Sequence, residues 1–413
     1  MNAPDRPTDA RATHSDPPLL FSPMRLRSLT ARNRVVVSPM CQYASTEGGP
    51  TDFHLVHLGQ FALGGAAIVF SEETAIEERG RKTWHCAGIY DDRHIPAYRR
   101  LTEFLSAHGA IAAIQIGHSG RKGAISPPWQ RYRPLSPEDA LAGEPPWPIV
   151  SSSALPDSPQ AQTPHSLSTR EIETLIGHWR EAAQRALQAG YRILEVHSAH
   201  GYLLHQFLSP IANQRRDGYG GDLAGRMRLT LEVIEAVRAV WPDELPLFLR
   251  VSAVDGSNGR WTMDDTVALA RAAYERGVDV VTTSSGGIHG PGTAAPVARV
   301  PGYHVPYAER VRCEVPGLHT LAVGLITEPA HAEEILQRGQ ADLIGLAREL
   351  LWNPHWPAHA AQALGAPDHL DLLPRGYGWW LARREDIRRV TAQAAAQPAS
   401  AAATPGDTAS DGG

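Results

Sequence analysis

Two histidines and a tyrosine stand close together near the middle of the chain, at His197, His200 and Tyr202. Two imidazoles at this spacing could each donate a hydrogen bond to one carbonyl oxygen and so polarise an enone, as an oxyanion hole does. The phenol of Tyr202 could donate the proton that a product carbon needs. A metal site is not expected, because the HExxH pattern is missing and no acidic residue among the neighbours would complete a facial site. Two core histidines are disfavoured, because the residues around them are small.

A second group of residues predicts an anion site in the C-terminal part of the chain. Gly324 would let backbone amides approach a ligand closely, and Arg348 offers a guanidinium that can bind an anion through two hydrogen bonds. A helix after Arg348 would add its N-terminus. Phosphate groups bind after the seventh and eighth strands of many barrels. The sequence therefore predicts a phosphate-bearing ligand, which these residues alone do not name.

The elements that must position these residues are short apolar runs that alternate with helical patterns. The runs are continuous, as is typical of parallel strands buried on both faces. The predicted strands are Arg34–Ser38, Ala67–Phe70, Ile111–Ile116, Arg192–His197, Leu247–Val251, Val278–Thr283, Thr320–Val323 and Asp342–Gly345. Eight such units favour one α/β domain, a closed (β/α)8 barrel of the TIM type. The alternative, an open doubly wound sheet, would want a GxGxxG turn after the first strand, and none is there.

Helical patterns fill the spaces between the later strands. They cover Ser168–Ala189, Leu223–Trp241, Met263–Arg276 and Glu328–Arg338. The first opens with Ser168 and carries Glu171 three residues later, which is a capping-box pattern. Gly190, Gly277 and Gly339 stand where a helix must end before the next strand. These boundaries place polar residues such as Glu72, Glu73 and His118 at the ends of strands, where the chemistry of a barrel is found.

The stretch Ser119–His165 follows the third strand and is too long and too rich in proline and serine for a simple connection. A long excursion at this position is more often a lid or an active-site insertion than filler. The composition of the two ends predicts disordered tails over residues 1–18 and 391–413, which leaves residues 19–390 for the barrel.

Composition excludes several classes of protein. The net charge is −5 with acids and bases mixed along the chain, so neither a nucleic acid nor a membrane surface is an expected partner. No apolar run approaches the length of a membrane span, and the first residues do not resemble a signal peptide. The three cysteines, Cys41, Cys86 and Cys313, are too scattered for a disulfide framework or an iron–sulfur cluster. A reducing cytoplasm is the expected setting.

Several stretches, taken in order, resemble the old yellow enzyme family of NADH:flavin oxidoreductases and NADPH dehydrogenases, in its thermophilic-like bacterial ene-reductase branch. They are SPMCQY from Ser38, QIGHSGRK from Gln115, EVHSAHGYLLHQFLSP from Glu195, NQRRDGYGGDLAGR from Asn213, RVS from Arg250 and AVGLIT from Ala322. The resemblance runs from Leu20 to Gly376. A single HxxH would say little, but an ordered set spread over six strand ends is specific.

The resemblance implies a barrel with noncovalent FMN, reduced by NADPH or NADH. It implies that Cys41 lies near the reactive edge of the flavin, that Gln115 binds its pyrimidine end, and that Arg250 faces the negative charge of the reduced flavin. The full set of implied cofactor-binding residues is Ser38, Pro39, Met40, Cys41, Glu73, Gln115, Arg250, Ser285, Gly324, Ala347 and Arg348.

The resemblance also assigns roles toward the substrate. His197 and His200 would bind the carbonyl of an activated alkene, Tyr43 would line the pocket, and Tyr202 would donate the proton. Together with Cys41 these are the expected catalytic residues. Arg375 matches an arginine that members of this branch extend into the site of a neighbouring subunit, which implies a homodimer or homotetramer. An exposed loop arginine is the alternative for Arg375.

Two residues depart from the family pattern. Glu73 stands where a small residue is usual beside the flavin, and its carboxylate would oppose the charge of the reduced flavin unless it turns away or pairs with a cation. We therefore expect Glu73→Ala to raise the flavin potential. Ala347 replaces the glycine that usually precedes the phosphate-binding arginine.

Other functions remain open at this stage. A flavin-dependent reductase of a CoA thioester, or of another conjugated or aromatic substrate, would use Arg131 and Arg133 of the excursion for the nucleotide. An amine-demethylating relative would need cysteines that this chain lacks. A flavin-free, phosphate-binding aldolase or isomerase is a third possibility, but an aldolase would want a lysine at a strand end, and the sixth strand ends in Thr282 and Thr283. A non-catalytic FMN-binding protein would leave the histidine pair and Tyr202 without a role.

Overall fold

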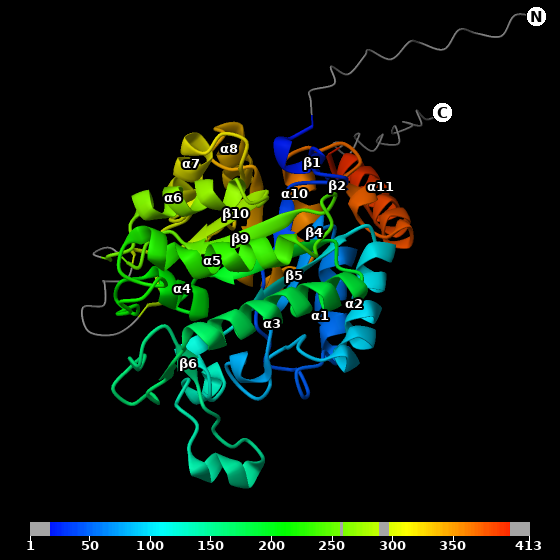
Figure 1. Cartoon of the computed structure of the whole chain (residues 1–413). Coiled ribbons are helices and arrows are strands. Elements are labelled where there is room, and N and C mark those ends of the chain that lie inside the picture. The colour runs from blue at the N-terminus through cyan, green and yellow to red at the C-terminus, as the bar shows by residue number, and fades with distance from the viewer. Residues whose placement is uncertain (1–16, 257–258, 289–296, 397–413) are drawn as a thin grey trace, which may run out of the picture.

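The computed structural model describes residues 17–256, 259–288 and 297–396. Eight parallel strands close into a barrel, with helices around it (Figure 1). The barrel strands are β3 (Val35–Val37), β4 (Ile68–Ala75), β5 (Ile111–Gly117), β8 (Ile193–Ser198), β9 (Leu247–Ser252), β10 (Val280–Ser284), β11 (His319–Ala322) and β12 (Leu343–Leu346). This closed barrel confirms the predicted (β/α)8 fold. The prediction succeeded because the continuous apolar runs of the sequence form parallel strands that are buried on both faces.

Strand β4 is the barrel strand whose end differs most from the prediction, since the ends of the other seven differ by one residue. The apolar run stops at Phe70, but the strand continues to Ala75, with Glu72 and Glu73 buried inside it. The pairing of β4 with β5 shifts register between Ser71 and Glu73. Such a bulge turns side chains to new directions and is common beside active sites. The two carboxylates are tolerated here because each has a partner from elsewhere in the chain, which the local sequence does not reveal.

The helices surround the strands in the expected order. They are α1 (Asp52–Leu63), α2 (Ile95–Ala107), α3 (Thr169–Gln188), α5 (Leu223–Arg238), α6 (Met263–Tyr274), α7 (Val305–Glu314) and α8 (Pro329–Gln337). The predicted capping box is present at α3, where Ser168 Oγ accepts from the Glu171 amide and the Glu171 carboxylate accepts from the Ser168 amide at 2.7 Å. The cap fixes where this helix begins.

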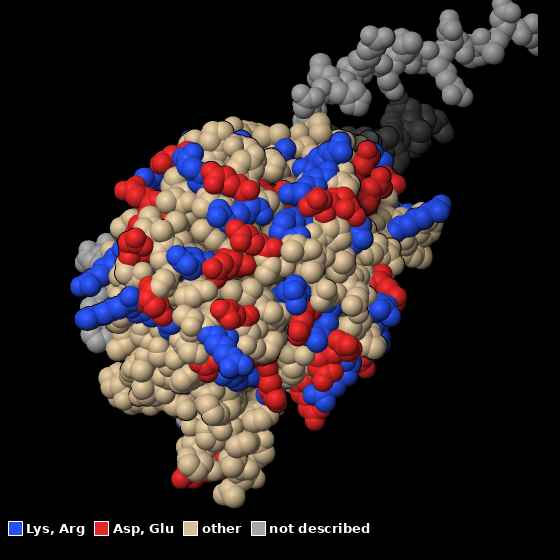
Figure 2. Space-filling view, viewed as in Figure 1, with Lys and Arg blue, Asp and Glu red and all other residues tan. Residues whose placement is uncertain are grey.

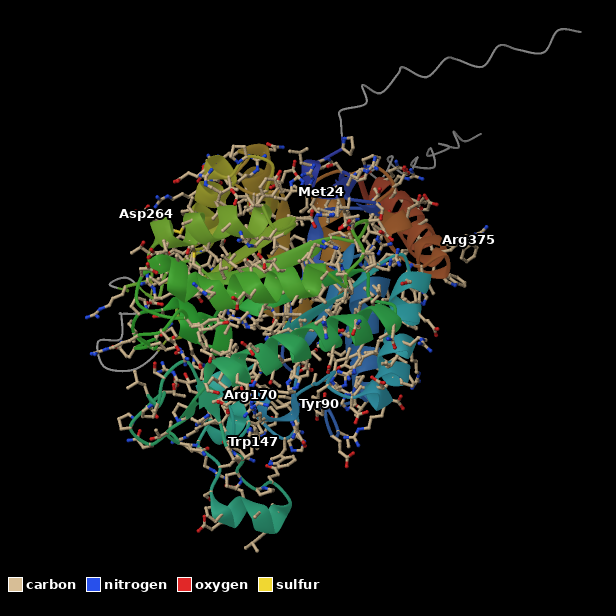
Figure 3. The ribbon with its side chains drawn as sticks, viewed as in Figure 1. Met24, Tyr90, Trp147, Arg170, Asp264 and Arg375 are labelled. Carbon is tan, nitrogen blue, oxygen red and sulfur yellow. The ribbon has the colours of Figure 1, made fainter. Side chains whose placement is uncertain are left out.

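A short hairpin closes one end of the barrel. Strands β1 (Met24–Leu26) and β2 (Leu29–Ala31) pair antiparallel, and Met24, Leu26 and Ala31 share an apolar cluster with inward-facing residues such as Phe70 and Phe248. The sequence did not predict this hairpin, because three-residue strands carry little pattern. Figure 3 places Met24 at the opposite end of the molecule from Trp147, which belongs to the long excursion.

The excursion after β5 is confirmed as an irregular insertion. It contains only the short turns η4 (Gly120–Lys122), η5 (Pro128–Gln130) and η6 (Pro137–Ala142) and the two-residue strands β6 (Val150–Ser151) and β7 (His165–Ser166). It projects below the barrel in Figure 1. On the face shown in Figure 2 the projection is mostly uncharged, whereas basic and acidic side chains are intermixed over the rest. The view shows no continuous basic stripe.

The C-terminal boundary differs from the prediction. After α9 (Arg348–Trp352), α10 (Trp356–Ala363) and η7 (His369–Leu372), the chain forms α11 (Arg375–Ala396). This helix runs past Thr391, where a disordered tail was expected to begin, because alanine-rich sequence is a good helix former when a helix already precedes it. Residues 1–16 and 397–413 of the expected tails lie outside the described residues.

Candidate active site

The histidine pair and Tyr202 come together where β8 ends. His197 lies in β8, His200 lies in the turn that follows with φ +58°, and Tyr202 precedes α4 (Leu203–Leu208). Nε2 of His197 and Nδ1 of His200 are 3.3 Å apart and hydrogen-bond each other, so a ligand oxygen that replaces this contact can reach both nitrogens. The ring of Tyr202 lies 5.2 Å from that of His197, centroid to centroid. This is the geometry of a carbonyl clamp with a phenol beside it.

The left-handed conformation of His200 is held by contacts on both sides. Its amide donates to Ser252 Oγ at 2.9 Å, and Ser284 Oγ lies 2.9 Å from its Nε2. Lys122 Nζ donates to the His200 carbonyl at 2.8 Å and also to the carbonyl of Gly287. A residue other than glycine at positive φ needs such support. Ser252 and Lys122 were not predicted as site residues, because their role depends on contacts with distant segments.

Both histidines are neutral over the ordinary pH range. Burial lowers the pKa of His197 and of His200 well below the usual value, and the nearby cation of Arg250 lowers both further. A neutral imidazole has a single N–H to donate. The pair is therefore suited to hydrogen-bond a carbonyl oxygen rather than to act as a strong acid.

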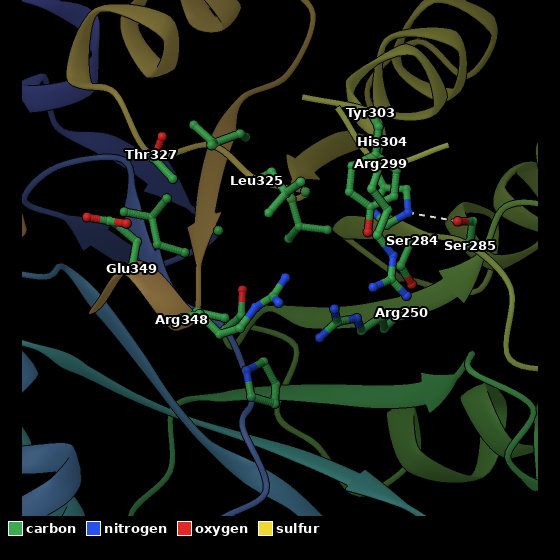
Figure 4. A pocket seen from close by; sticks show the side chains of 18 of the residues that line it. Arg250, Ser284, Ser285, Arg299, Tyr303, His304, Leu325, Thr327, Arg348 and Glu349 are labelled. Carbon is green, nitrogen blue, oxygen red and sulfur yellow. Dashed lines mark hydrogen bonds between the residues drawn. The ribbon is translucent and has the colours of Figure 1, made fainter. Parts of the chain in front are cut away.

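A cavity of about 530 Å³ opens beside the clamp (Figure 4). Arg250 and Arg348 extend toward each other into this cavity, and neither forms an ion pair with a residue in the described part of the chain. Ser38 Oγ and Arg250 Nε are buried without a hydrogen-bond partner among those residues. Buried polar atoms without partners and facing cations that form no ion pair within the described residues fit a polar, anionic ligand. The cavity therefore fits a phosphate-bearing ligand, which Arg348 would help to hold.

Small residues keep the floor of the cavity open. A Cβ at Gly345 would come within 2.6–2.8 Å of Leu321, Val323 and Ser38, and Gly324 has φ +114°. Ala347 precedes α9, of which Arg348 is the first residue. The helix predicted after Arg348 is only five residues long, so the guanidinium, rather than a helix dipole, supplies the positive charge. Ser285, another predicted phosphate-site residue, lines the cavity and lies 2.8 Å from His304 Nε2.

A buried polar network supports Arg250 from below. Gln115 Nε2 donates to Glu195 Oε1 at 2.8 Å, and Thr282 Oγ1 donates to Glu195 Oε2 at 2.5 Å. Burial lowers the pKa of Arg250, and the neighbouring carboxylate of Glu195 opposes that effect. Glu195 was quoted in the family motif but not predicted as a site residue. An acidic residue within an apolar strand was the signal that could have found it.

The segment after β3 reaches the cavity through Ser38 and Pro39, whereas Met40 and Cys41 line neither the cavity nor the chamber. Pro39 lines the cavity, Met40 packs partly against the core, and Cys41 is half-buried. Burial raises the pKa of the Cys41 thiol, so the residue is a thiol and not a thiolate. Tyr43 packs its ring against the edge of Trp129 in the excursion, 5.7 Å between centroids.

Glu73 has a buried cationic partner. Its carboxylate pairs with Lys82, and the two side chains are 5% and 3% exposed. The family departure seen in the sequence is therefore electrically compensated within the protein. Lys82 was not predicted as a site residue, because the pairing becomes visible only once β4 and the loop after it are placed.

A second space, the chamber, is lined by His200 and Tyr202 and measures about 440 Å³. Its walls come mainly from the excursion, through Ala124, Ile125, Tyr132, Pro134, Leu135 and Ile149. The prediction that the excursion belongs to the active site therefore has a structural counterpart. The aliphatic wall of the chamber suits the body of an organic substrate, while Lys82, Arg121, Lys122 and Asp157 add charged groups to the lining.

Arg375 does not join the site within one chain. It is exposed at the start of α11, at the outer edge of the molecule in Figure 3, and lines neither the cavity nor the chamber. The described residues hold no cluster of three or more side chains that could bind a metal ion. None of the helices that the structure describes is long and apolar enough to cross a membrane.

The barrel, the clamp and the arginine-lined cavity together define a flavin-dependent oxidoreductase of the (β/α)8 class. The chain belongs to the NADH:flavin oxidoreductase / NADH oxidase family, whose sequence pattern matches residues 19–366. This confirms the family predicted from the motifs, and with it FMN as the cofactor. The flavin-free aldolase and isomerase alternatives are thereby wrong.

Relatives and solved structures agree with this assignment. The chain is 41% identical to an NADPH dehydrogenase of Geobacillus sp. (strain WCH70) over 349 residues, which are 84% of this chain and 95% of that protein. Morphinone reductase has a TM-score of 0.70 at 26% identity, covering 89% of this chain and 96% of its own. 2-Naphthoyl-CoA reductase has a TM-score of 0.74 at 23% identity, covering 84% of this chain and only 52% of its own, and shows the fold alone.

Proposed function

We propose that the protein is an ene-reductase, which reduces the carbon–carbon double bond of an α,β-unsaturated carbonyl compound at the expense of a nicotinamide. The observation that carries the proposal is the convergence of His197 Nε2 and His200 Nδ1 to 3.3 Å beside Tyr202. Two neutral donors aimed at one point would stabilise the negative charge that develops on a carbonyl oxygen when its alkene is attacked.

The residues divide the work as follows. Arg348, Ser285 and the backbone at Gly324 would hold the FMN phosphate, and Arg250 would stabilise negative charge on the flavin. Bound FMN supplies the two-electron chemistry that links the nicotinamide to the β-carbon of the alkene. The histidine pair would bind and polarise the carbonyl, and Tyr202 would deliver a proton to the α-carbon.

The chamber is the proposed place for the rest of the acceptor. Its walls at Ile125, Leu135 and Ile149 are apolar, and it adjoins both His200 and Tyr202. An activated alkene whose carbonyl sits at the clamp could therefore extend an apolar substituent into the chamber. The acceptor class that we propose is a small conjugated ketone or aldehyde with an apolar body.

NADPH is the reductant to test first, since NADPH dehydrogenases are the relatives at about 40% identity. We also propose a homo-oligomer, a dimer or a tetramer, in which Arg375 enters the site of a neighbouring subunit. Support comes from the exposed aromatic residues of α11, which include Trp379 and Trp380 at 52% and 67% exposure. A cytoplasmic location is proposed from the three free cysteines.

An anaerobic titration tests the function in two steps. The purified protein should be yellow, NADPH should bleach it, and 2-cyclohexenone should restore the colour without oxygen. The proposal would be contradicted if the protein takes up no FMN. It would also be contradicted if no enone reoxidises the bleached form.

The reductase of a CoA thioester is the weaker reading of the same site. It relied on Arg131 and Arg133 to bind the nucleotide, but Arg133 is already occupied by a two-pronged ion pair with Asp139 at 2.6 and 2.7 Å. The likeness to 2-naphthoyl-CoA reductase concerns the fold alone. Nothing in the described excursion therefore favours a CoA substrate over a small enone.

A further inference from the structure

The sequence contains only two lysines, Lys82 and Lys122, and both meet at one tyrosine. Their Nζ atoms lie 5.2 and 5.7 Å from the centroid of the Tyr202 ring. Arginine fills the other basic positions of the chain. A compact ammonium differs from a guanidinium because it concentrates its charge at one point. The two lysines are therefore placed where a concentrated charge beside a phenol could matter.

Lys122 is committed to another task. It donates hydrogen bonds to the carbonyls of His200 and Gly287 and so supports the turn that holds the clamp. Lys82 has Glu73 as its hydrogen-bond partner. Of the two, Lys82 is the one whose charge is not engaged in holding backbone.

The bulge in β4 and the space at Gly117 position Glu73 for its pairing with Lys82. The bulge in β4 re-aims Glu73, and its side chain occupies the space above Gly117, where a Cβ would lie 2.4 Å from Glu73 Oε1. Only glycine at position 117 leaves room for the carboxylate. A buried pair costs desolvation and is seldom a gain in stability over apolar residues. Its presence beside the proposed proton donor is better explained by the charge that it provides.

Electrostatics link Lys82 to the phenol. Burial raises the pKa of Tyr202, and Lys82 is the main influence that opposes the rise, against Cys41, Glu73 and Cys86. Burial works against the charge of Lys82, but the paired carboxylate of Glu73 helps to raise its pKa well above the usual value, so that it stays an ammonium. Lys82 is thus a fixed cation rather than a proton donor of its own.

We propose that Lys82, held by Glu73, is a positioning residue that stabilises the phenolate of Tyr202 when this tyrosine gives up its proton. In the step, the O–H bond of Tyr202 breaks and its electron pair stays on the phenolate oxygen. A C–H bond forms at the α-carbon from the electron pair of the acceptor's enolate, and a proton from solvent later restores the phenol. The inference rests on the proposed function, because it assumes that the acceptor is an activated alkene.

A double-mutant cycle tests the inference. The pair is replaced by uncharged residues of similar size, Lys82→Met with Glu73→Gln, so that no lone charge is left buried. Reoxidation of the NADPH-bleached enzyme by 2-cyclohexenone is followed with Tyr202 present and with Tyr202→Phe. We expect the neutral pair to slow reoxidation about 10- to 100-fold when Tyr202 is present, within the range of general-acid effects, and by less than about twofold in the Phe background.

Lys122→Met is the matched control, because it removes the other lysine from the same ring. Its effect passes through the turn at His200, so it should persist in the Tyr202→Phe background. Bleaching by NADPH should change less than about threefold in the neutral-pair variant. An equal slowing in both backgrounds would overturn the inference, since Lys82 would then act without Tyr202. If the neutral pair does not retain FMN, Lys82→Arg enters the same cycle, with a smaller slowing that must also vanish in the Phe background.

The outcome for the proposed function is separable. Wild-type enzyme that bleaches with NADPH but is not reoxidised by any enone defeats the function, whereas an additive cycle in an active enzyme defeats only the role of Lys82. Lysine labelled with ¹³C at Cε gives a readout that needs no turnover. Lys82 should hold its proton up to pH 10.5 in the wild type and release it at lower pH in Glu73→Gln. A titration unchanged by Glu73→Gln would contradict the pairing.

Discussion

At the scale of single residues, the site depends on side chains that burial keeps in one protonation state. His197 and His200 are held neutral, Cys41 is held as a thiol, and Arg250 keeps a cation close to all three. Neutral donors and a fixed cation can stabilise developing negative charge without first losing a proton of their own. The functional consequence is a site whose binding properties should change little near neutral pH.

Removal of either histidine should damage one half of the catalytic cycle selectively. We expect His197→Ala or His200→Ala to slow reoxidation by 2-cyclohexenone roughly 100-fold, as loss of one oxyanion-hole donor does elsewhere, and to slow bleaching by NADPH far less. The wild-type reoxidation rate should stay level from pH 7 to pH 6, because neither lowered histidine pKa is reached and Lys122 stays protonated. Stopped-flow absorbance of the flavin measures both rates. Equal losses in the two halves would count against the carbonyl clamp.

Glu73 should set the redox potential of the flavin together with its partner. Glu73→Ala removes a negative charge and leaves the Lys82 ammonium uncompensated, so the reduced flavin is favoured. We expect the midpoint potential to rise by about 30 mV or more, the shift for a tenfold change in a two-electron equilibrium. The control is Glu73→Gln with Lys82→Met, which removes both charges and should leave the potential close to that of the wild type. An unchanged potential in Glu73→Ala would refute the expectation.

Lys122 should titrate close to neutrality. Burial lowers its pKa from 10.5 to about 8, with Asp157 opposing the effect. Since the folded-state value lies below the unfolded one, the cost to stability is full below about pH 8 and is relieved as the pH rises from about 8 to 10.5. With two lysines in the chain, ¹³Cε NMR should show one signal with a midpoint near 8, which Lys122→Arg removes. A midpoint above 10 would show that the side chain is solvated.

At the scale of elements, the excursion after β5 walls the chamber that we propose as the acceptor space. The barrel strands carry the clamp and the cofactor cavity, while Ala124, Ile125 and Ile149 of the excursion wall the chamber. Loops on a rigid scaffold commonly carry specificity in this way. Choice of acceptor and the chemistry of reduction are therefore built on different segments and should be separable by mutation.

Substitution in the excursion should change which acceptors are used. Ile125→Asp places a carboxylate in the apolar wall of the chamber without touching the clamp. We expect the KM for carvone, a cyclohexenone with apolar substituents, to rise about tenfold relative to that for 2-cyclohexenone, since burial of a few methylene groups contributes about 1–2 kcal/mol. Steady-state kinetics with both acceptors gives the ratio. The same ratio as in the wild type would mean that the acceptor does not enter the chamber.

The sequence predicted those elements whose local residue pattern alone indicates a buried strand or a helix. Continuous apolar runs marked the barrel strands, and capping signals marked helices such as α3. The end of β4 was missed because Glu72 and Glu73 are buried only through distant partners, among them His54 at 3.2 Å from Glu72. The site residues at strand ends were predicted because their positions follow directly from the predicted strands. Lys82, Lys122 and Glu195 were missed, because tertiary contacts give them their roles.

At the scale of the whole molecule, one outer helix exposes several large apolar side chains. Helix α11 exposes Tyr377, Trp379, Trp380 and Ile387. Aromatic side chains gathered on one helix are typical of surfaces that contact another protein. The proposed oligomer would use this helix, which also carries Arg375.

The oligomer should depend on those aromatic residues. We expect Trp379→Ser with Trp380→Ser to lower the molar mass in solution to that of one chain, because the variant removes the two largest apolar groups of the surface. Light scattering after gel filtration measures it. Arg375→Ala should leave the mass unchanged and weaken acceptor binding. A wild-type protein that is monomeric at micromolar concentration would refute the proposal.

Because the chain has only two lysines, proteolysis after lysine can report local opening of the native protein. A protease that cuts only after lysine has two target bonds, after Lys82, which is buried, and after Lys122, which is half-buried. Cleavage of the native protein then requires the region around Tyr202 to open, so its rate follows the population of that open form. Digestion with and without FMN or an enone would show how far each ligand keeps this end of the barrel closed.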